Sequence, residues 1–319
     1  MACTNTPRMC IATARVPDPF RAVEGARSVI PYISPADWPR VATDARVTRT
    51  PLLIRGAFAP QAAAWSPRRF ADRWPDLEVR ATVDLPEHGV PYFESFHAHQ
   101  ETMTLVTLVE MLERGCRCYL HEMSFEFFPE IERDCDFAHL RLDNISAIKL
   151  WLGSRTRSGL HYDNADNMFA QMYGVKRVVL MSPRVSRFLY PFPDSPAKSQ
   201  VDPEHPDLRR YPRFARCPVW TGDLEPGDAL YIPRGWWHFI AADDVSISVN
   251  CWHGDSLTWG EHLRMWFSGG TPVIARTAFD FVRCGILGRP YQRRLFSAPP
   301  LGLQVYQFLA SGLRKERQS

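Results

Sequence analysis

The sequence predicts a mostly β domain, an antiparallel sandwich or barrel of short strands, with helices on either side of it along the chain. From residue 145 onward, short apolar stretches alternate with turn signals such as Glu225-Pro226-Gly227-Asp228, where proline takes the second position of a β-turn. Earlier segments and the segment from Ser256 onward instead carry apolar residues at helical spacing. A length of 319 residues favours one large domain with appended ends.

The composition is that of a folded protein without strong charge. Hydrophobic residues make up 45% and aromatic residues 12% of the chain, which excludes a disordered chain. A net charge of +3 is too small to predict nucleic-acid binding. The eight cysteines form no Cys-x-x-Cys motif, so we expect reduced thiols. We find no apolar run of membrane-spanning length and no convincing secretory leader, and therefore expect a cytoplasmic protein with no membrane partner.

Helix and strand signals alternate in the first part of the chain. Ser34-Pro35 and Ser66-Pro67 each place proline at the start of a helical pattern. The strands instead show either a continuous apolar run or strict alternation of apolar and polar residues. We therefore expect helices at 35–50, 65–74 and 104–115, and strands at 51–57, 77–83 and 118–123.

Short strands dominate the middle of the chain. We expect them at 147–154, 167–174, 176–183, 228–234 and 245–252, with a hairpin turn at 173–175. Residues 184–222 hold seven of the 27 prolines and predict a long surface excursion between strands. This pattern divides the chain into a loosely ordered segment at 1–30, a catalytic domain at 31–255 and a helical extension at 256–319.

Three His-x-Asp triplets are the clearest chemical motif. In a strand, residues i and i+2 face the same side, so such a pair can bind one metal ion together with a ligand from a neighbouring strand. Two histidines and one carboxylate form the facial triad that selects non-haem Fe(II). The triplets are His161-Tyr162-Asp163, His205-Pro206-Asp207 and His253-Gly254-Asp255.

The surroundings of the triplets favour the first one. His161 and Asp163 begin a strand-rich stretch, and His238 closes a later strand that could lie antiparallel to it. The second triplet lies in the proline-rich excursion, and glycine separates the two ligands of the third. The spacing thus indicates a metal site of His161, Asp163 and His238. The alternative is that all three are ordinary polar residues near a core.

Several motifs in one order resemble a known family. They are HYDNADNMFAQMYGVKRVVLMSP at 161–183, SQVDPEHPDLRRYPRF at 199–214, LEPGDALYIPRGWWH at 224–238 and VSISVN at 245–250. These motifs are similar to those of the JmjC or cupin-like Fe(II)- and 2-oxoglutarate-dependent oxygenases, most of all the asparaginyl hydroxylase that inhibits hypoxia-inducible factor and the tRNA wybutosine hydroxylase. The resemblance implies a double-stranded β-helix (jelly-roll) core with a helical C-terminal extension, and a need for Fe(II), 2-oxoglutarate and O2.

The resemblance also implies roles for individual residues. His161, Asp163 and His238 match the iron ligands, and Lys176 matches the lysine that pairs with the distal carboxylate of 2-oxoglutarate. One of only four lysines among 38 basic residues stands at that position. Further matches to the cosubstrate pocket are Tyr119, Ser158, Asn167 and Asn250. Tyr119 could equally be a half-buried strand residue.

Two residues concern the substrate. Lys198 replaces the glutamine that meets the target amide in the asparaginyl hydroxylase, so asparagine specificity is not implied. Lysine at this position suggests an acidic or carbonyl-bearing group on the substrate, or a different approach to the site. Trp252 would pack near the iron and help to exclude water, although a core role is equally consistent with its strand position.

The resulting hypothesis is a dioxygenase that hydroxylates a C–H bond of a peptide or protein side chain while 2-oxoglutarate is decarboxylated to succinate. The alternatives are a hydroxylase of a tRNA base or small molecule, a JmjC demethylase, and a cupin-fold binding protein without catalysis. The apolar residues of the C-terminal extension, especially at 301–313, further predict a homodimer, as the resemblance does. The extension could instead cap its own barrel.

Overall fold

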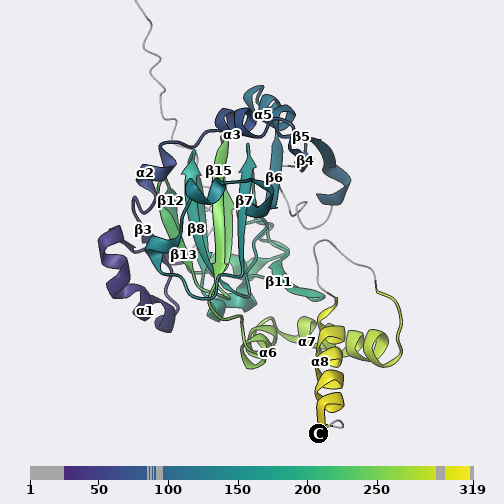
Figure 1. Ribbon diagram of the computed structural model, residues 1–319. Coiled ribbons are helices and arrows are strands. Elements are labelled where there is room, and N and C mark those ends of the chain that lie inside the picture. Colours follow the sequence, from purple (N-terminus) through teal and green to yellow (C-terminus); the bar gives the residue numbers. More distant parts are fainter. Residues whose placement is uncertain are drawn as a thin grey trace, which may run out of the picture.

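The computed structural model describes residues 25–84, 86, 88, 90, 96–291 and 299–316, and within these the side chains of residue 96 and of 311–316 are left out. Two β-sheets form the centre of the molecule, helices lie against the larger sheet, and a helical C-terminal region extends from its lower end (Figure 1). The predicted mostly β, jelly-roll fold with flanking helices is confirmed. No helix of the described chain is long and apolar enough to cross a membrane.

The larger sheet has nine strands and is mostly antiparallel. Its central strand β8 is buried at every position except the last, because both of its faces are covered. In spatial order the strands are β2 (Tyr32–Ile33), β3 (Leu52–Ile54), β13 (Ala229–Ile232), β8 (Asp166–Tyr173), β15 (Ser246–His253), β7 (Ala147–Gly153), β6 (Cys118–Ser124), β4 (Glu78–Val83) and β5 (Gln100–Thr104).

The smaller sheet has four strands and packs across one face of the larger one. Its order is β1 (Arg27–Val29), β12 (Val219–Leu224), β9 (Lys176–Met181) and β14 (Trp237–Ala241). Apolar side chains of both sheets, including Phe169, Val178 and Leu230, form one buried cluster between them. β1 corrects the expectation of a loosely ordered segment through residue 30, since backbone pairing with β12 holds Arg27–Val29 in place. The rest of that expectation, residues 1–24, lies outside the described residues.

The predicted hairpin at 173–175 is wrong. β8 pairs with β13 and β15 in the larger sheet, whereas the next strand, β9, pairs with β12 and β14 in the smaller one. The turn therefore carries the chain over the edge from one sheet to the other. Gly174 makes this crossing with φ of 70°, and a Cβ atom there would lie 2.2 Å from the carbonyl oxygen of Val245. The turn at 225–228 also crosses between sheets, and the predicted β-turn is confirmed by the Asp228 N–H donating to the Glu225 carbonyl.

The N-terminal helices lie beside and at one end of the larger sheet (Figure 1), and their apolar side chains share one core cluster with it. Leu105, Leu108 and Leu112 of the amphipathic helix α5 are buried there, as its periodicity predicts. The α-helices of this group are α1 (Trp38–Thr48), α2 (Ala59–Ala62), α3 (Pro67–Arg73) and α5 (Leu105–Glu113). Short 3-10 turns join these elements at η2 (Pro35–Asp37), η3 (Phe96–His99), η4 (Phe125–Phe127), η5 (Ile131–Arg133) and η6 (Ala138–Leu140).

The proline-rich excursion covers the outer face of the smaller sheet. It contains η7 (Pro183–Phe188), the two-stranded ribbon of β10 (Pro191–Phe192) and β11 (Ser195–Ser199), and η8 (Pro212–Arg216). Phe214 of the excursion is buried against Trp237 and Phe239 of the small sheet. The predicted long excursion between strands is therefore present, and its buried side enlarges the core.

The C-terminal region consists of helices, as predicted. α6 (Trp259–Ser268) begins at a capping box between Thr258 and Glu261, and is followed by α7 (Thr271–Asp280), the π-helical turn η9 (Phe281–Ile286) and α8 (Leu301–Glu316). α8 approaches α7 so closely that a Cβ atom on Gly302 would lie 2.2 Å from the carbonyl oxygen of Thr277. Trp266, Val273 and Leu301 form the small core of this region.

Candidate metal centre and cosubstrate pocket

His161 and His238 are brought together by backbone pairing. The N–H of His161 donates to the carbonyl of His238 at 3.2 Å, and the N–H of His238 donates to the carbonyl of His161 at 2.7 Å. The two rings lie 4.2 Å apart between centroids. His238 belongs to β14 of the small sheet, so it starts a new strand and does not close the preceding one as predicted. Cross-strand pairing nevertheless supplies the second histidine that the metal site needs.

Both histidines present the same nitrogen to the site. Nδ1 of His161 lies 2.7 Å from the carbonyl oxygen of Gly159, and Nδ1 of His238 lies 3.0 Å from that of Trp236. Because a carbonyl only accepts, each Nδ1 carries the proton and each Nε2 keeps its lone pair. Burial and the proximity of His238 lower the pKa of His161 to about 4, so this ring is neutral at pH 7. Neutral imidazole is the form that binds a metal ion.

Asp163 completes the cluster and is held in place by two side chains. Its Oδ1 lies 3.8 Å from Nε2 of His161, and its Oδ2 lies 3.8 Å from Nε2 of His238. Trp252 Nε1 donates to Oδ2 at 2.9 Å and Asn167 Nδ2 at 3.4 Å. Although burial alone would raise the pKa of Asp163, the two histidines and these hydrogen bonds lower it, so the carboxylate is ionised.

The three side chains fit a single divalent metal ion. One ligand atom from each lies within 4.8 Å of the others, and all come from one pair of neighbouring backbone segments. Two imidazole nitrogens and one carboxylate suit non-haem Fe(II) and leave other coordination positions for ligands. The spacing argument therefore selected three residues that the fold brings together.

The other two triplets do not join this cluster. His205 lies with His88 and Asp202 in a second, more exposed group whose ligand atoms also fall within 4.8 Å of one another. His253 is completely buried, and neither of its ring nitrogens has a hydrogen-bond partner within the described chain. Neither histidine has the paired backbone that fixes His161 beside His238.

Lys176 is the second unusual feature of the interior. It is 3% exposed, and within the described residues no carboxylate lies within ion-pair distance of its Nζ. Its only close charge-related contact there is the ring of Phe169, whose centroid is 5.4 Å from Nζ. Burial lowers the pKa of Lys176 to about 7. An ammonium group without an internal partner is costly to bury, and a bound carboxylate would remove that cost.

Unsatisfied polar atoms gather on the same face of the larger sheet. Asn167 opposes Trp252 across the β8–β15 pairing, and Asn250 opposes Phe169, the residue beneath Lys176. Among the described residues, the Oδ1 atoms of Asn167 and Asn250 are buried without a hydrogen-bond partner, as is the hydroxyl of Ser248. Buried polar atoms are normally paired, so this group fits a polar ligand such as the dicarboxylate 2-oxoglutarate.

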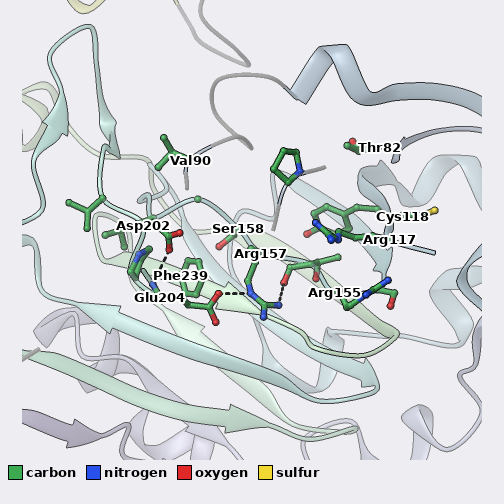
Figure 2. A pocket seen from close by; sticks show the side chains of 18 residues that line it. Thr82, Val90, Arg117, Cys118, Arg155, Arg157, Ser158, Asp202, Glu204 and Phe239 are labelled. Atoms are coloured by element: carbon green, nitrogen blue, oxygen red, sulfur yellow. Dashed lines mark hydrogen bonds and ion pairs between the residues drawn. The ribbon is translucent and has the colours of Figure 1, made fainter. Parts of the chain in front are cut away.

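A surface hollow adjoins this interior. Its wall includes the segment 154–160, which leads directly into His161, and Tyr119 and Ser158 line it. Figure 2 shows Arg157 beside Glu204 in this hollow, where Nε of Arg157 donates to the carboxylate at 2.5 Å. The Ser158 hydroxyl accepts from the Ile240 N–H at 2.9 Å, and the Tyr119 ring lies 5.8 Å from that of Trp151. Tyr119 and Ser158 thus line the hollow beside the segment that leads to His161, and their roles toward 2-oxoglutarate stay predictions.

Two charged residues lie near the metal centre. The backbone of Lys198 in β11 bridges that of His161, which places the predicted substrate residue next to a metal ligand.

The second charged residue, Glu122, was not predicted from the sequence. It lies at a β-bulge in β6 with φ of 53°, a conformation that is strained for glutamate. Loss of surrounding water and the nearby Asp163 raise its pKa, while Lys149 and Lys198 oppose the shift. Two polar residues in succession, His121-Glu122, are the one sequence signal of this bulge.

Comparison with known proteins identifies the family. A model of the cupin-like domain matches residues 39–258. Lysine-specific demethylase 8 from Xenopus tropicalis is 39% identical over 272 residues, covering 77% of this chain and 57% of the relative. Jumonji C domain-containing protein 5 from Drosophila melanogaster is 32% identical, covering 41% and 35%. Human tRNA wybutosine-synthesizing protein 5 is 41% identical over 28% of each chain.

A jelly roll that holds two histidines and an aspartate around one point is the architecture of a mononuclear metal oxygenase. The chain belongs to the cupin-like JmjC family of Fe(II)- and 2-oxoglutarate-dependent oxygenases. It spans 57% or less of the length of the relatives named above.

Proposed function

We propose that this protein hydroxylates a C–H bond on a peptide or protein side chain, with 2-oxoglutarate as cosubstrate. The reaction converts substrate, O2 and 2-oxoglutarate into hydroxylated substrate, succinate and carbon dioxide, with one oxygen atom in the new hydroxyl and the other in succinate. The observation that supports this proposal is that one domain contains both the metal-ligand cluster and a buried lysine, Lys176. No described carboxylate forms an ion pair with that lysine. Bound iron would supply the activation of O2 and the oxidation of the C–H bond.

Each residue of the site has a specific task in this proposal. His161, Asp163 and His238 would hold the iron, and Trp252 keeps the Asp163 carboxylate in position. Lys176 would pair with the distal carboxylate of 2-oxoglutarate through a charge-assisted hydrogen bond. The Asn167 and Asn250 side chains would orient the cosubstrate through their amide groups.

The two charged side chains near the metal centre support a substrate with polar or charged groups. Lys198 offers a cation and Glu122 an anion beside the metal centre. Such a pair can bind a peptide by meeting both a backbone carbonyl and a donor or cationic group of its side chain. Because the backbone of Lys198 is tied to His161, the bound group would be held close to the reacting centre.

Other reactions share the same site. The relative named lysine-specific demethylase 8 favours demethylation as the alternative, in which the hydroxylated N-methyl carbon would leave as formaldehyde. The relative named tRNA wybutosine-synthesizing protein 5 favours hydroxylation of a tRNA base, and a small-molecule substrate would use the same chemistry. A cupin-fold binding protein without catalysis is the least supported alternative, because it does not explain why Lys176 is buried.

Succinate release in the presence of Fe(II), ascorbate and O2 tests the proposal. The full chain would be screened against peptide pools, methylated peptides, tRNA and free amino acids, with product masses read by mass spectrometry. We expect a gain of one oxygen atom on a peptide. Asp163→Ala should abolish turnover, and His205→Ala, from the second triplet, should retain it. Loss of turnover in His205→Ala alone would show that the wrong triplet was chosen.

We also propose that the protein acts in the cytoplasm as a homodimer formed by its C-terminal helices. Phe267, Phe279, Ile286 and Leu287 are each more than half exposed on α6, on α7, on the π-helical turn and just after it. Phe308 and Leu309 of α8 are also exposed. Apolar side chains gathered on one region are typical of an interface, and a second copy would bury the same region on both chains.

A further inference from the structure

We infer that the outer surface of the proline-rich excursion, together with the start of α6, binds a single-stranded nucleic acid. Five arginines define this surface, which we call the arginine surface. They are Arg184, Arg187, Arg213, Arg216 and Arg264. This inference concerns a docking surface and does not depend on the reaction proposed above.

The short helices arrange four of these arginines in two rows. Arg184 and Arg187 are three residues apart in the 3-10 helix η7, and Arg213 and Arg216 are three residues apart in the 3-10 helix η8. Side chains at i and i+3 of a 3-10 helix lie directly above one another, so each pair forms a row along one face. η7 and η8 pack together, which brings Arg187, Arg213 and Arg216 around one hollow.

The charge of this surface is unbalanced. All five side chains are exposed, and none of their guanidinium groups has an ion pair or hydrogen bond within the described residues. Neither 184–190 nor 209–218 contains an acidic residue. Elsewhere arginines are commonly paired, as Arg55 is with Asp228 and Arg157 with Glu204. Guanidinium groups with free donors match the oxygens of phosphate.

A hollow lined by arginine and aromatic side chains lies at each end of η7. The first, of about 540 Å3, is lined by Arg184 and Arg264, by the half-buried Trp220 and by Glu261, whose carboxylate pairs with Arg49. Trp236 also lines it but is 7% exposed, with its ring centroid 5.3 Å from that of Trp220, so Trp220 offers the accessible aromatic surface. The second, of about 520 Å3, is lined by Arg187, Arg213 and Arg216 with Phe188 and Pro212, and the Arg187 guanidinium lies over the Phe188 ring, 5.0 Å from its centroid. Hollows of this size can hold a nucleobase against an aromatic face while neighbouring arginines hold the phosphates.

The combination of arginines with aromatic side chains in both hollows favours a nucleic-acid strand over an acidic protein or a membrane. An acidic peptide or anionic lipid surface needs only the cations, whereas unpaired bases also need faces on which to stack. A duplex hides its bases and would leave the two hollows unused. The same excursion carries Lys198 to the metal centre, so a bound strand would lie on the segment that holds this predicted substrate residue.

Fluorescence anisotropy with labelled RNA of about 20 nucleotides tests the inference on the full chain without 2-oxoglutarate. The variant Arg187→Gln/Arg213→Gln/Arg216→Gln should bind at least about tenfold more weakly, and its salt dependence should fall by a slope of about 2. The matched control Arg40→Gln/Arg114→Gln/Arg133→Gln removes the same charge from exposed arginines that line neither hollow, and should bind like wild type.

Further ligands distinguish RNA from DNA and nucleic acids from other anionic partners. Single-stranded DNA of the same sequence shows whether the sugar matters, and either nucleic acid supports the inference. An abasic strand of equal length should bind more weakly, because it cannot stack. Equal binding of wild type and the triple variant, equal binding of intact and abasic strands, or preferential binding of an acidic peptide or of phosphatidylserine vesicles would each overturn the inference.

Discussion

The indole of Trp252 donates to the Oδ2 atom of Asp163 at 2.9 Å, across a sequence separation of 89 residues. This hydrogen bond connects a residue near the end of β15 to the carboxylate of the metal cluster. The other carboxylate oxygen of Asp163, Oδ1, lies near Nε2 of His161. Trp252 therefore acts as a positioning residue in addition to its predicted packing role.

Trp252→Phe should weaken metal binding without unfolding the protein. Phenylalanine keeps most of the ring volume but removes the donor, so Asp163 can rotate away from the two histidines. We expect about a 10- to 100-fold loss of Fe(II) or Co(II) affinity, measured by metal titration in the absence of O2. Trp65→Phe is the matched control, because it loses one indole hydrogen bond, to the Asp134 carbonyl, far along the chain from the cluster. An equal loss of metal affinity in both variants would contradict this role.

Lys176→Met should separate cosubstrate binding from stability. Loss of a charge-assisted hydrogen bond worth about 1.5–3 kcal/mol should weaken 2-oxoglutarate binding by about 10- to 150-fold while metal affinity is kept. The ligand-free variant should be at least as stable as wild type, because methionine fills the buried site without a charge. Calorimetric titration with 2-oxoglutarate and thermal unfolding measure the two effects. Unchanged affinity for 2-oxoglutarate would show that Lys176 does not contact it.

The binding of 2-oxoglutarate should depend on pH through the same residue. Burial lowers the pKa of Lys176 to about 7, so the empty site loses this proton as pH rises through 7. A bound carboxylate favours the ammonium form and raises the pKa again, so binding above pH 7 takes up a proton and weakens as pH rises. Titrations in two buffers of different ionisation enthalpy would detect the proton. The pH dependence should be absent in Lys176→Met.

Glu261→Gln should destabilise the protein near neutral pH and much less in acid. Although burial would raise the pKa of Glu261, its hydrogen bonds within the Thr258 capping box and to Arg49 lower it to about 2. Since the pKa is depressed on folding, the stabilisation is fully present above the unfolded value of 4.5 and is lost as pH falls toward 2. The cap contributes about 0.5–2 kcal/mol.

Thermal unfolding of wild type and Glu261→Gln at pH 7 and at pH values below 4.5 would measure this loss. The difference in Tm should shrink as the pH falls. Glu113→Gln is the control, because Glu113 pairs with Arg68 at an exposed site where ion pairs contribute little. A difference that stays constant with pH would show that the carboxylate charge is not responsible.

The proposed dimer predicts a concentration-dependent mass. Phe279→Ser/Ile286→Ser places polar groups on the exposed apolar region of the C-terminal helices and should convert a dimer into a folded monomer. Multi-angle light scattering at micromolar concentration measures this change. Val29→Ser/Val47→Ser, two similarly exposed apolar residues of other elements, is the control and should remain dimeric. A monomeric wild-type chain would refute the proposal.

Local sequence patterns determined most of the secondary structure and the main ligand set. The spacing of His161 and Asp163 placed two ligands together, and the apolar periodicity of 104–115 placed α5, because these properties depend on residues a few positions apart. The scarcity of lysine drew attention to Lys176. Its match to the family then assigned it a role, and its position does not contradict that role.

Only the tertiary structure decided which distant segments meet. The pairing of His161 with His238 and the crossing at Gly174 depend on strand partners far along the chain, which local periodicity does not encode. The bulge that holds Glu122 near the metal centre and the hydrogen bond from Trp252 to Asp163 have the same origin. Each results from the register of one strand on another, and register is set when the two sheets bury their shared apolar faces.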